Sequence, residues 1–174
     1  IFSFFIFFNS AIALSGDLKI VYVDIDKVIN QSKAGKNIST QLEAINNNNI
    51  NKFKKDEKKL ADEEKNLVKK KNILSNDDFE KKVKILKKNI NIYKKNINVS
   101  RKELEAKRVE GTTKILDILN PILSDYSSKN SISLIIQKKN IVIGQSELDI
   151  TSQILELLNS KIKTVKLNWC QKFF

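Results

Sequence analysis

Two aspartates separated by one residue have the spacing most suggestive of chemistry in this sequence. Asp24 and Asp26 directly follow an apolar run, and carboxylates at the end of a strand can act as acids, bases or cation ligands. The chain holds no His, and its single cysteine, Cys170, cannot form an internal disulfide. Histidine-based general base catalysis, catalytic triads and His or multi-Cys metal sites are therefore excluded within this chain. We expect Cys170 to be incidental, because no partner thiol or basic helix terminus is evident beside it.

The aspartate pair is similar to the first motif of haloacid-dehalogenase-type phosphatases. In that family the first aspartate, here Asp24, is a nucleophile, and the second, here Asp26, is an acid and base. Such an enzyme needs a parallel sheet with further Mg²⁺-binding carboxylates, but no alternation of strands and helices follows, and no Gly-Asp pair occurs downstream. We therefore predict no enzyme, no cofactor and no catalytic or metal-binding residues. The aspartates are expected to end a strand and open a helix.

A heptad pattern dominates the elements that would position any site. Apolar residues alternate at steps of four and three over 79–97, and a sparser series recurs every seven residues over 53–74. Only a helix places such sets on one narrow stripe. Between the two series, Ser75 can N-cap a new helix. The pattern predicts an antiparallel coiled-coil hairpin over 33–114 with its tip near 75–78.

A small α+β body completes the predicted architecture. The apolar run 19–24 predicts a strand, residues 132–143 predict a β-hairpin with strands at 132–136 and 141–143, and an amphipathic helix follows over 152–162. The body would thus contain about three strands. In chain order, the predicted segments are a signal remnant 1–13, a first body segment 14–32, the hairpin 33–114, a second body segment 115–163 and a tail 164–174.

The predicted body is near the lower size limit for a domain that is stable on its own. Excluding the hairpin, about 55 to 60 residues remain, near the size at which a single core is marginal. Its apolar strands would also leave sheet edges open. We therefore expect oligomerisation through the β body, with candidate interface residues Val21, Val23, Leu134, Ile135 and Ile136.

The charge lies almost entirely on the predicted hairpin. The whole chain has 32 Lys plus Arg and 20 Asp plus Glu, a net charge of +12. Residues 33–114 have 23 and 12 of these, a net charge of +11. Such a basic rod attracts acidic polypeptide, phosphates, or an anionic lipid or lipopolysaccharide surface. The alternative is a merely solvated face that reflects coding bias toward Lys, Asn and Ile.

The first residues resemble a secretory signal. Residues 1–8 are uncharged and strongly apolar, and Ala11-Ile12-Ala13 places small residues at the two positions that a signal peptidase recognises. We expect cleavage there, a mature chain that begins near Leu14, and work outside the cytoplasm. The alternative is a membrane anchor, in which residues before Ile1 would extend the stretch to the roughly 20 that a spanning helix needs.

The order of elements resembles the Skp (OmpH) family of periplasmic chaperones over residues 18–162. Its most specific matching block is Leu148-Asp149-Ile150-Thr151-Ser152-Gln153-Ile154-Leu155-Glu156-Leu157-Leu158-Asn159. The resemblance implies a periplasmic homotrimer whose strands assemble a small β body, with three hairpins projecting as tentacles around a cavity. It also implies an ATP-independent holdase that captures unfolded outer-membrane β-barrel proteins and prevents their aggregation.

The resemblance directs attention to one leg of the hairpin as the client-binding surface. Residues 79–97 are expected to pack in the hairpin seam, so the sparser first leg is the better place for partly exposed apolar contacts. Basic side chains on that leg can attract acidic clients quickly. The candidate client-binding residues are Phe53, Lys54, Lys55, Lys58, Lys59, Leu60 and Leu67.

Two other functions stay open. A membrane-tethered coiled-coil stalk or scaffold would differ from the chaperone mainly in keeping its N-terminal segment. A nucleic-acid-binding protein could track phosphates with its basic rod. Against it stand the export signal, the lack of an aromatic stacking platform, and the absence of a basic region continuous with a parallel zipper, so no nucleic acid partner is expected.

Overall fold

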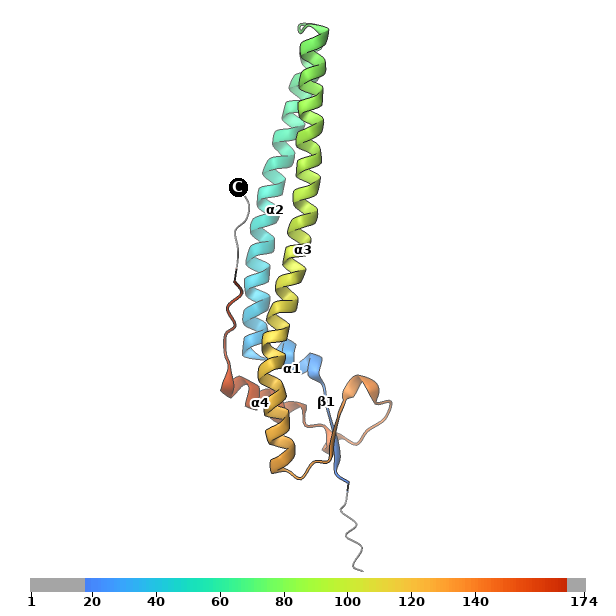
Figure 1. The fold of residues 1–174 in the computed structure, drawn as a ribbon, viewed down its shortest axis with the longest axis vertical. Helices are drawn as coiled ribbons and strands as arrows, with labels where there is room; N and C mark the ends of the chain where they lie inside the picture. Colours follow the sequence, from blue (N-terminus) through green and yellow to red (C-terminus); the bar gives the residue numbers. More distant parts are fainter. Residues whose placement is uncertain (1–17, 169–174) are drawn as a thin grey trace, which may run out of the picture.

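The protein is a long helical hairpin that rises from a small α/β body (Figure 1). The computed structural model describes residues 18–168, so the predicted signal remnant 1–13 and the tail residues 169–174 lie outside the described residues. The predicted α+β fold with its projecting antiparallel hairpin is confirmed. In chain order, the elements are β1 (Ile20–Val23), α1 (Ile25–Gln31), α2 (Lys33–Lys69), α3 (Asn76–Lys129), β2 (Leu134–Gln137) and α4 (Thr151–Lys161), with 3-10 turns at Lys138–Asn140 and Ser146–Leu148.

A break at Ser32 separates α1 from α2. The Ser32 hydroxyl accepts the backbone N–H of Gly35 at 3.0 Å and so caps α2. Gly35 is required because a Cβ there would lie 1.8 Å from the carbonyl oxygen of Ile29. The close approach of the two backbones lets α2 leave the body directly after α1.

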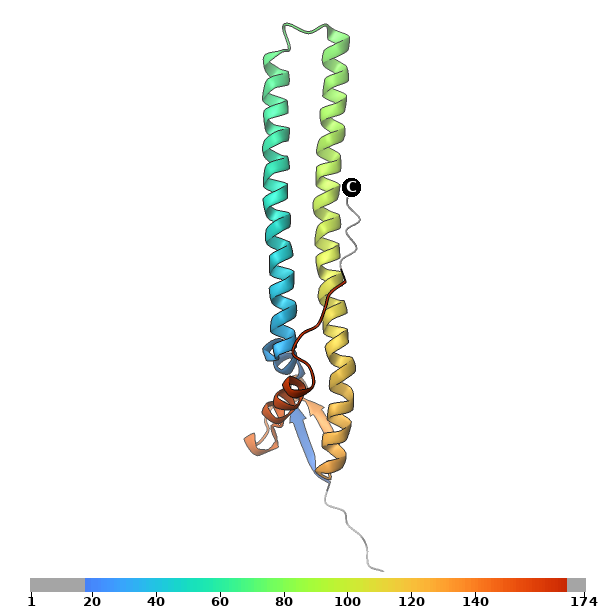
Figure 2. The ribbon, with the colours of Figure 1, turned by 90° about the vertical axis from the view of Figure 1, so that its left-hand side faces the viewer.

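Helices α2 and α3 lie side by side and antiparallel (Figure 2). The predicted cap of α3 is confirmed, because the Ser75 hydroxyl accepts the Asp78 N–H at 3.2 Å. Helix α2 ends at Lys69, where the N–H of Lys70 closes the last turn. The tip therefore occupies residues 70–75, slightly before the predicted 75–78.

The seam between the two helices is only half-buried above the body. None of the described residues from 43 to 110 is buried, because two helices alone cannot cover each other's apolar stripes. Asn49 donates a hydrogen bond from its side-chain amide to the Ser100 hydroxyl at 2.7 Å across the seam. A polar pair at one seam position fixes the axial register of the two helices, because any shift would leave both groups unpaired.

The hydrophobic core sits where α1, α3, α4 and β1 meet at the base of the hairpin. Its largest fully buried side chains include Val28, Ile115, Leu119, Ile154 and Leu158. Truncating such a side chain to Ala typically costs about 2–5 kcal/mol, because transfer free energy is lost and a cavity remains. The body is thus held by aliphatic packing contributed from both ends of the chain.

The prediction of a β-hairpin over 132–143 is wrong. β2 pairs in parallel with β1, with Ile20 opposite Leu134 and Val23 opposite Gln137. The N–H of Ile141 then bonds the carbonyl of Lys138, which closes a 3-10 turn and directs the chain away from β2. Residues 141–143 form no strand, and residues 18–168 contain two strands where about three were predicted.

The far edge of β1 is occupied by the segment before α4. The N–H of Ile150 donates to the carbonyl of Tyr22 at 2.9 Å, and Asp149 forms an isolated bridge with the same residue. Thr151 then accepts the N–H of Asp24 through its hydroxyl at 2.9 Å and donates to the Asp149 carboxylate. These bonds join the end of β1 to the start of α4. They fall at the beginning of the block 148–159, the most specific part of the family resemblance.

Candidate functional site

The predicted apolar contacts of the first leg lie in the seam but are not enclosed by it. Phe53, Leu60 and Leu67 are each half-buried on α2. The Phe53 ring meets the Tyr93 ring of α3 edge to face, with centroids 6.2 Å apart and an interplanar angle of 82°. Burial, together with the carboxylates of Glu57 and Asp56, raises the pKa of Tyr93. These side chains hold the hairpin together and still present part of their surface.

The four predicted basic contacts lie beside this seam and are exposed. Lys54, Lys55, Lys58 and Lys59 occupy one and a half turns of α2, and Lys59 approaches Glu63 at 4.0 Å. An exposed i,i+4 pair at that distance contributes little to stability. The positive charge of these four ammonium groups is therefore directed mainly to the solvent, where it can attract acidic groups.

Sequence reasoning missed a second apolar stripe on α3. Ile85 and Ile92 are 59% and 46% exposed, and they lie seven residues apart, off the seam. Their heptad spacing was the available signal, but the stronger series at 79–97 concealed it. Ile92 also lines a shallow groove with Leu60 and Tyr93, so the stripe adjoins the predicted first-leg contacts.

Further exposed aliphatic side chains line the hairpin from its tip to its base. Ile73 at the tip is 81% exposed and lies two residues after the basic run 69–71. The others are Ile50 and Val68 on α2 and Val109 on α3. The hairpin therefore combines net positive charge with scattered apolar surface along its whole length.

The predicted oligomer-interface residues fall into two groups. Val21 and Val23 are buried in the chain's own core, so their side chains are not on the surface. Leu134 is 49% exposed, and Ile135 and Ile136 are half-buried on β2, whose second edge has no partner strand within residues 18–168.

Two residues that sequence reasoning assigned to a strand form a separate exposed apolar surface. Val142 and Ile143 are 98% and 91% exposed in the loop that follows β2. Two adjacent branched aliphatic side chains in water form an apolar patch that no other part of residues 18–168 covers.

Asp24 has a structural role at the start of α1, as predicted. Its carboxylate accepts the backbone N–H of Lys27 at 2.8 Å, and Asp26 lies in the first turn of the same helix. Carboxylates stabilise a helix N-terminus through its exposed N–H groups and dipole. Among the described residues, no group of three or more His, Cys, Asp or Glu side chains could hold a metal ion.

Three ion pairs stabilise the body and the base of the hairpin. Burial acts to raise the pKa of Asp149, but hydrogen bonds from Lys138 and Thr151 outweigh it and hold that pKa below its ordinary value. At the base, Glu110 accepts hydrogen bonds from Lys107 at 2.6 Å and Lys114 at 2.7 Å. These two ammonium groups lower the pKa of Glu110 to about 2.

The fold is a basic helical hairpin that presents charged and partly exposed apolar side chains along its length. Within residues 18–168, none of the helices has the length and apolarity needed to cross a bilayer. The profile of the family described as outer membrane protein (OmpH-like) matches residues 19–158, and the chain belongs to this family. The resemblance predicted from the sequence is thus confirmed.

A solved structure shows the same fold. It is the crystal structure of a provisionally assigned outer membrane chaperone (OmpH-like) from Caulobacter crescentus CB15. The two chains superpose with a TM-score of 0.80 at 19% sequence identity, over 89% of this chain and 94% of that chain. No curated protein sequence shows significant similarity to this chain.

Proposed function

We propose that this protein is an ATP-independent holdase that binds unfolded outer-membrane β-barrel proteins in the periplasm after export. Membership of the OmpH-like family supports a chaperone role. The observation that carries the proposal is the long basic hairpin, in which none of the described residues from 43 to 110 is buried. Its apolar side chains are therefore available for many weak contacts along the rod.

Such a surface suits a client that must be kept apart from others without being bound tightly. Positive charge accelerates encounter with acidic chains, and partly exposed aliphatic groups then give diffuse contacts. An unfolded barrel protein exposes strands that would otherwise pair with other chains and aggregate. Release needs no hydrolysis, because each contact is weak and folding of the client in the membrane removes its apolar surface.

The same proposal includes a homotrimer assembled through the β body. The open edge of β2, and Val142 and Ile143 in the loop after it, are the surfaces that we assign to subunit contacts. Pairing of strand edges between copies would satisfy backbone groups and cover apolar side chains together. Three hairpins on one body would surround a shared space, in which a client is isolated.

The test is suppression of aggregation by the mature chain without nucleotide. A urea-unfolded outer-membrane β-barrel protein is diluted into buffer with and without the chain, and turbidity is followed. We expect suppression, with weaker suppression by Ile85→Ser/Ile92→Ser. The matched control is Leu18→Ser, which removes an exposed aliphatic group of the body that is 75% exposed. Equal turbidity with and without excess protein would refute the proposal.

A further inference from the structure

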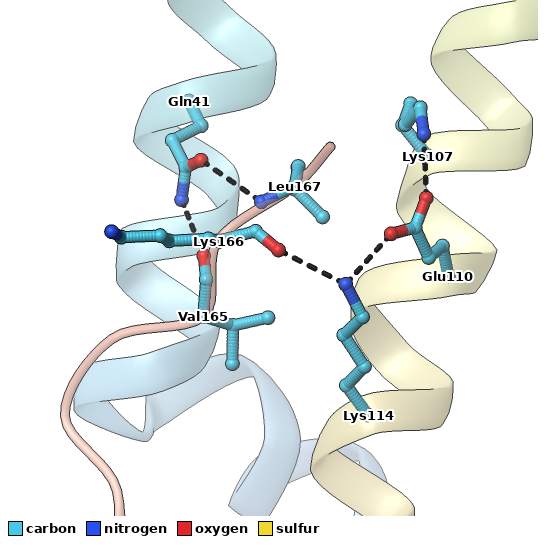
Figure 3. A network of polar contacts seen from close by, with 7 residues as sticks. All are labelled: Gln41, Lys107, Glu110, Lys114, Val165, Lys166 and Leu167. Atoms are coloured by element: carbon cyan, nitrogen blue, oxygen red, sulfur yellow. Dashed lines mark hydrogen bonds and ion pairs between the residues drawn. The ribbon is translucent and has the colours of Figure 1, made fainter. Parts of the chain in front are cut away.

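The chain's own C-terminal segment lies in a groove at the base of the hairpin. Residues 164–168, here called the strap, cross from α4 onto the face between α2 and α3 (Figures 2 and 3). Val165 and Leu167 are each 5% exposed, whereas Lys166 between them is exposed. This alternation is that of an extended strand. The strap lies beyond residue 158, where the match to the family profile ends.

Side chains of the two helices bind the strap's backbone. From α2, the Asn37 side-chain Oδ1 accepts the N–H of Val165 at 3.1 Å, and the Gln41 side-chain Nε2 donates to the Val165 backbone carbonyl at 2.7 Å. The Gln41 side-chain Oε1 also accepts the N–H of Leu167 at 3.4 Å. These contacts depend on the peptide groups of the strap, not on the identity of its side chains.

The side-chain amides of Asn37 and Gln41 orient each other through a hydrogen bond. Gln41 donates to the Asn37 side chain at 2.8 Å, one helical turn away. From α3, Lys114 donates to the Lys166 carbonyl at 3.0 Å while Glu110 holds its ammonium group at 2.7 Å (Figure 3). Groups oriented before binding lose less freedom when a peptide arrives.

Gly111 on α3 leaves room for the Leu167 side chain of the strap. A Cβ at Gly111 would lie 2.8 Å from the Ile38 side chain and 3.1 Å from that of Leu167. The absence of a side chain at Gly111 thus lets Leu167 pack close to α3. The groove therefore accommodates two apolar side chains from positions two residues apart in the bound segment. Its polar groups bind the backbone of that segment.

We propose that this groove is a binding site for an extended polypeptide that carries branched aliphatic residues two positions apart. In the resting chain the strap occupies the site, and a segment of an unfolded client replaces it. This inference rests on the proposed function. The strap sequence Thr164-Val165-Lys166-Leu167-Asn168 alternates polar and apolar residues. Strands of outer-membrane barrels alternate in the same way, so an unfolded barrel offers many segments of this pattern.

The strap can exchange with a client because two buried aliphatic side chains and four hydrogen bonds to its backbone hold it in place. Residues 162–163 join the strap to α4, and a short tether gives an effective concentration on the order of 1 mM. A client already captured by the hairpin has a comparable effective concentration at the groove. The client therefore competes for the groove at a similar effective concentration. When no client is present, the strap covers the groove.

The first test is a peptide titration of a chain whose strap has been released. Val165→Asp/Leu167→Asp removes both apolar anchors and leaves the groove intact, with folding checked by circular dichroism. The probe is a fluorescent peptide of residues 163–168, and the control peptide has Asp at its two apolar positions. If the peptide Kd is about 0.1 mM, wild type should bind it about tenfold more weakly than the released chain, because the strap competes. Equal binding of the two peptides, or by the two chains, would overturn the proposal.

The second test keeps the strap sequence almost native and follows its displacement. A nitroxide is attached in Lys166→Cys/Cys170→Ser, where the labelled side chain is exposed and the flanking anchors remain. A urea-unfolded outer-membrane β-barrel protein is added until its own fluorescence anisotropy saturates. We expect the mobile fraction of the label to rise with client binding. An unchanged spectrum at saturation would mean that the strap is a permanent brace.

The two tests separate this inference from the proposed function. Absence of client binding in the anisotropy titration would reject the holdase, yet the peptide titration would still decide whether the groove binds extended chains. Client binding without peptide binding to the released chain would reject the groove alone. Because the label experiment needs no strap-destabilising substitution, it also decides the matter if the released chain does not fold.

Discussion

Reversing four lysines on the first leg of the hairpin should slow client capture without changing the fold. Lys54, Lys55, Lys58 and Lys59 are exposed, and their replacement by Glu takes the net charge of residues 33–114 from +11 to +3. They span about 7.5 Å of helix axis, less than one Debye length at physiological salt, which is about 8 Å. An approaching carboxylate therefore experiences them as one cluster whose charge changes by eight units.

The size of the effect follows from Coulomb's law. At about 10 Å in water, one pair of unit charges interacts by about 0.4 kcal/mol, so eight units amount to about 3 kcal/mol before screening. Screening reduces this to about 2.4 kcal/mol at 0.01 M salt and about 1 kcal/mol at 0.15 M. The expected loss in capture rate is then about 50-fold at low salt and about fivefold at physiological salt. The fold should lose only a few tenths of a kcal/mol per exposed i,i+4 contact.

The assay is stopped-flow capture of an acidic, urea-unfolded β-barrel protein at the two salt concentrations. The control is Lys27→Glu/Lys129→Glu/Lys139→Glu/Lys161→Glu, which makes the same change in net charge with exposed residues of the body and the lower end of α3. It should slow capture less, because these charges lie away from the first leg. Equal capture rates of wild type and the first-leg variant at low salt would refute the electrostatic argument.

Three other predictions concern assembly, pH and export. Val142→Asp/Ile143→Asp should lower the mass measured by light scattering but keep the wild-type melting curve, since both side chains are more than 90% exposed; an unchanged mass would contradict the assigned interface. The pKa of Glu110 is lowered to about 2, so its ion pairs stabilise the fold above the ordinary value near 4.5 and are lost as pH falls toward 2. The melting temperature should therefore fall less between pH 5 and pH 2.5 in Glu110→Gln than in wild type, and equal falls would argue against the pairing. With a start Met and a basic n-region restored, the chain should lose about its first 13 residues on export, as checked by intact mass; a retained N-terminus in the membrane fraction would favour the stalk.

Features specified by local periodicity could be predicted from the sequence. The heptads at 53–74 and 79–97 predicted two helices because every seventh residue returns to nearly the same face, whatever lies elsewhere in the chain. Ser75 predicted the start of α3 because an N-cap bond spans only three residues. Asp24 predicted the start of α1 for the same reason. The basic character of the rod is a matter of composition alone.

The partners of the strands and of the strap were decided only by tertiary structure. Alternating apolar residues at 132–143 are compatible with a hairpin, but they do not say which strand lies alongside. β2 instead pairs with β1, which lies more than a hundred residues earlier, because the core of α1, α3 and α4 holds the two segments side by side. Likewise, nothing in the sequence near Val165 indicates that Asn37 and Gln41 bind its backbone.

The solvent exposure of the candidate site also could not be predicted from local sequence patterns. The same heptad residues would be buried in a bundle of three or four helices. Here they are half-buried because, within residues 18–168, only α2 and α3 cover each other along the hairpin beyond residue 42. Val21 looked like an interface residue from its sequence, yet the chain's own helices cover it. The sequence determines which residues share a face, since that depends on bond geometry over a few residues. Which faces meet depends on long-range packing free energy, and the tertiary structure alone determines it.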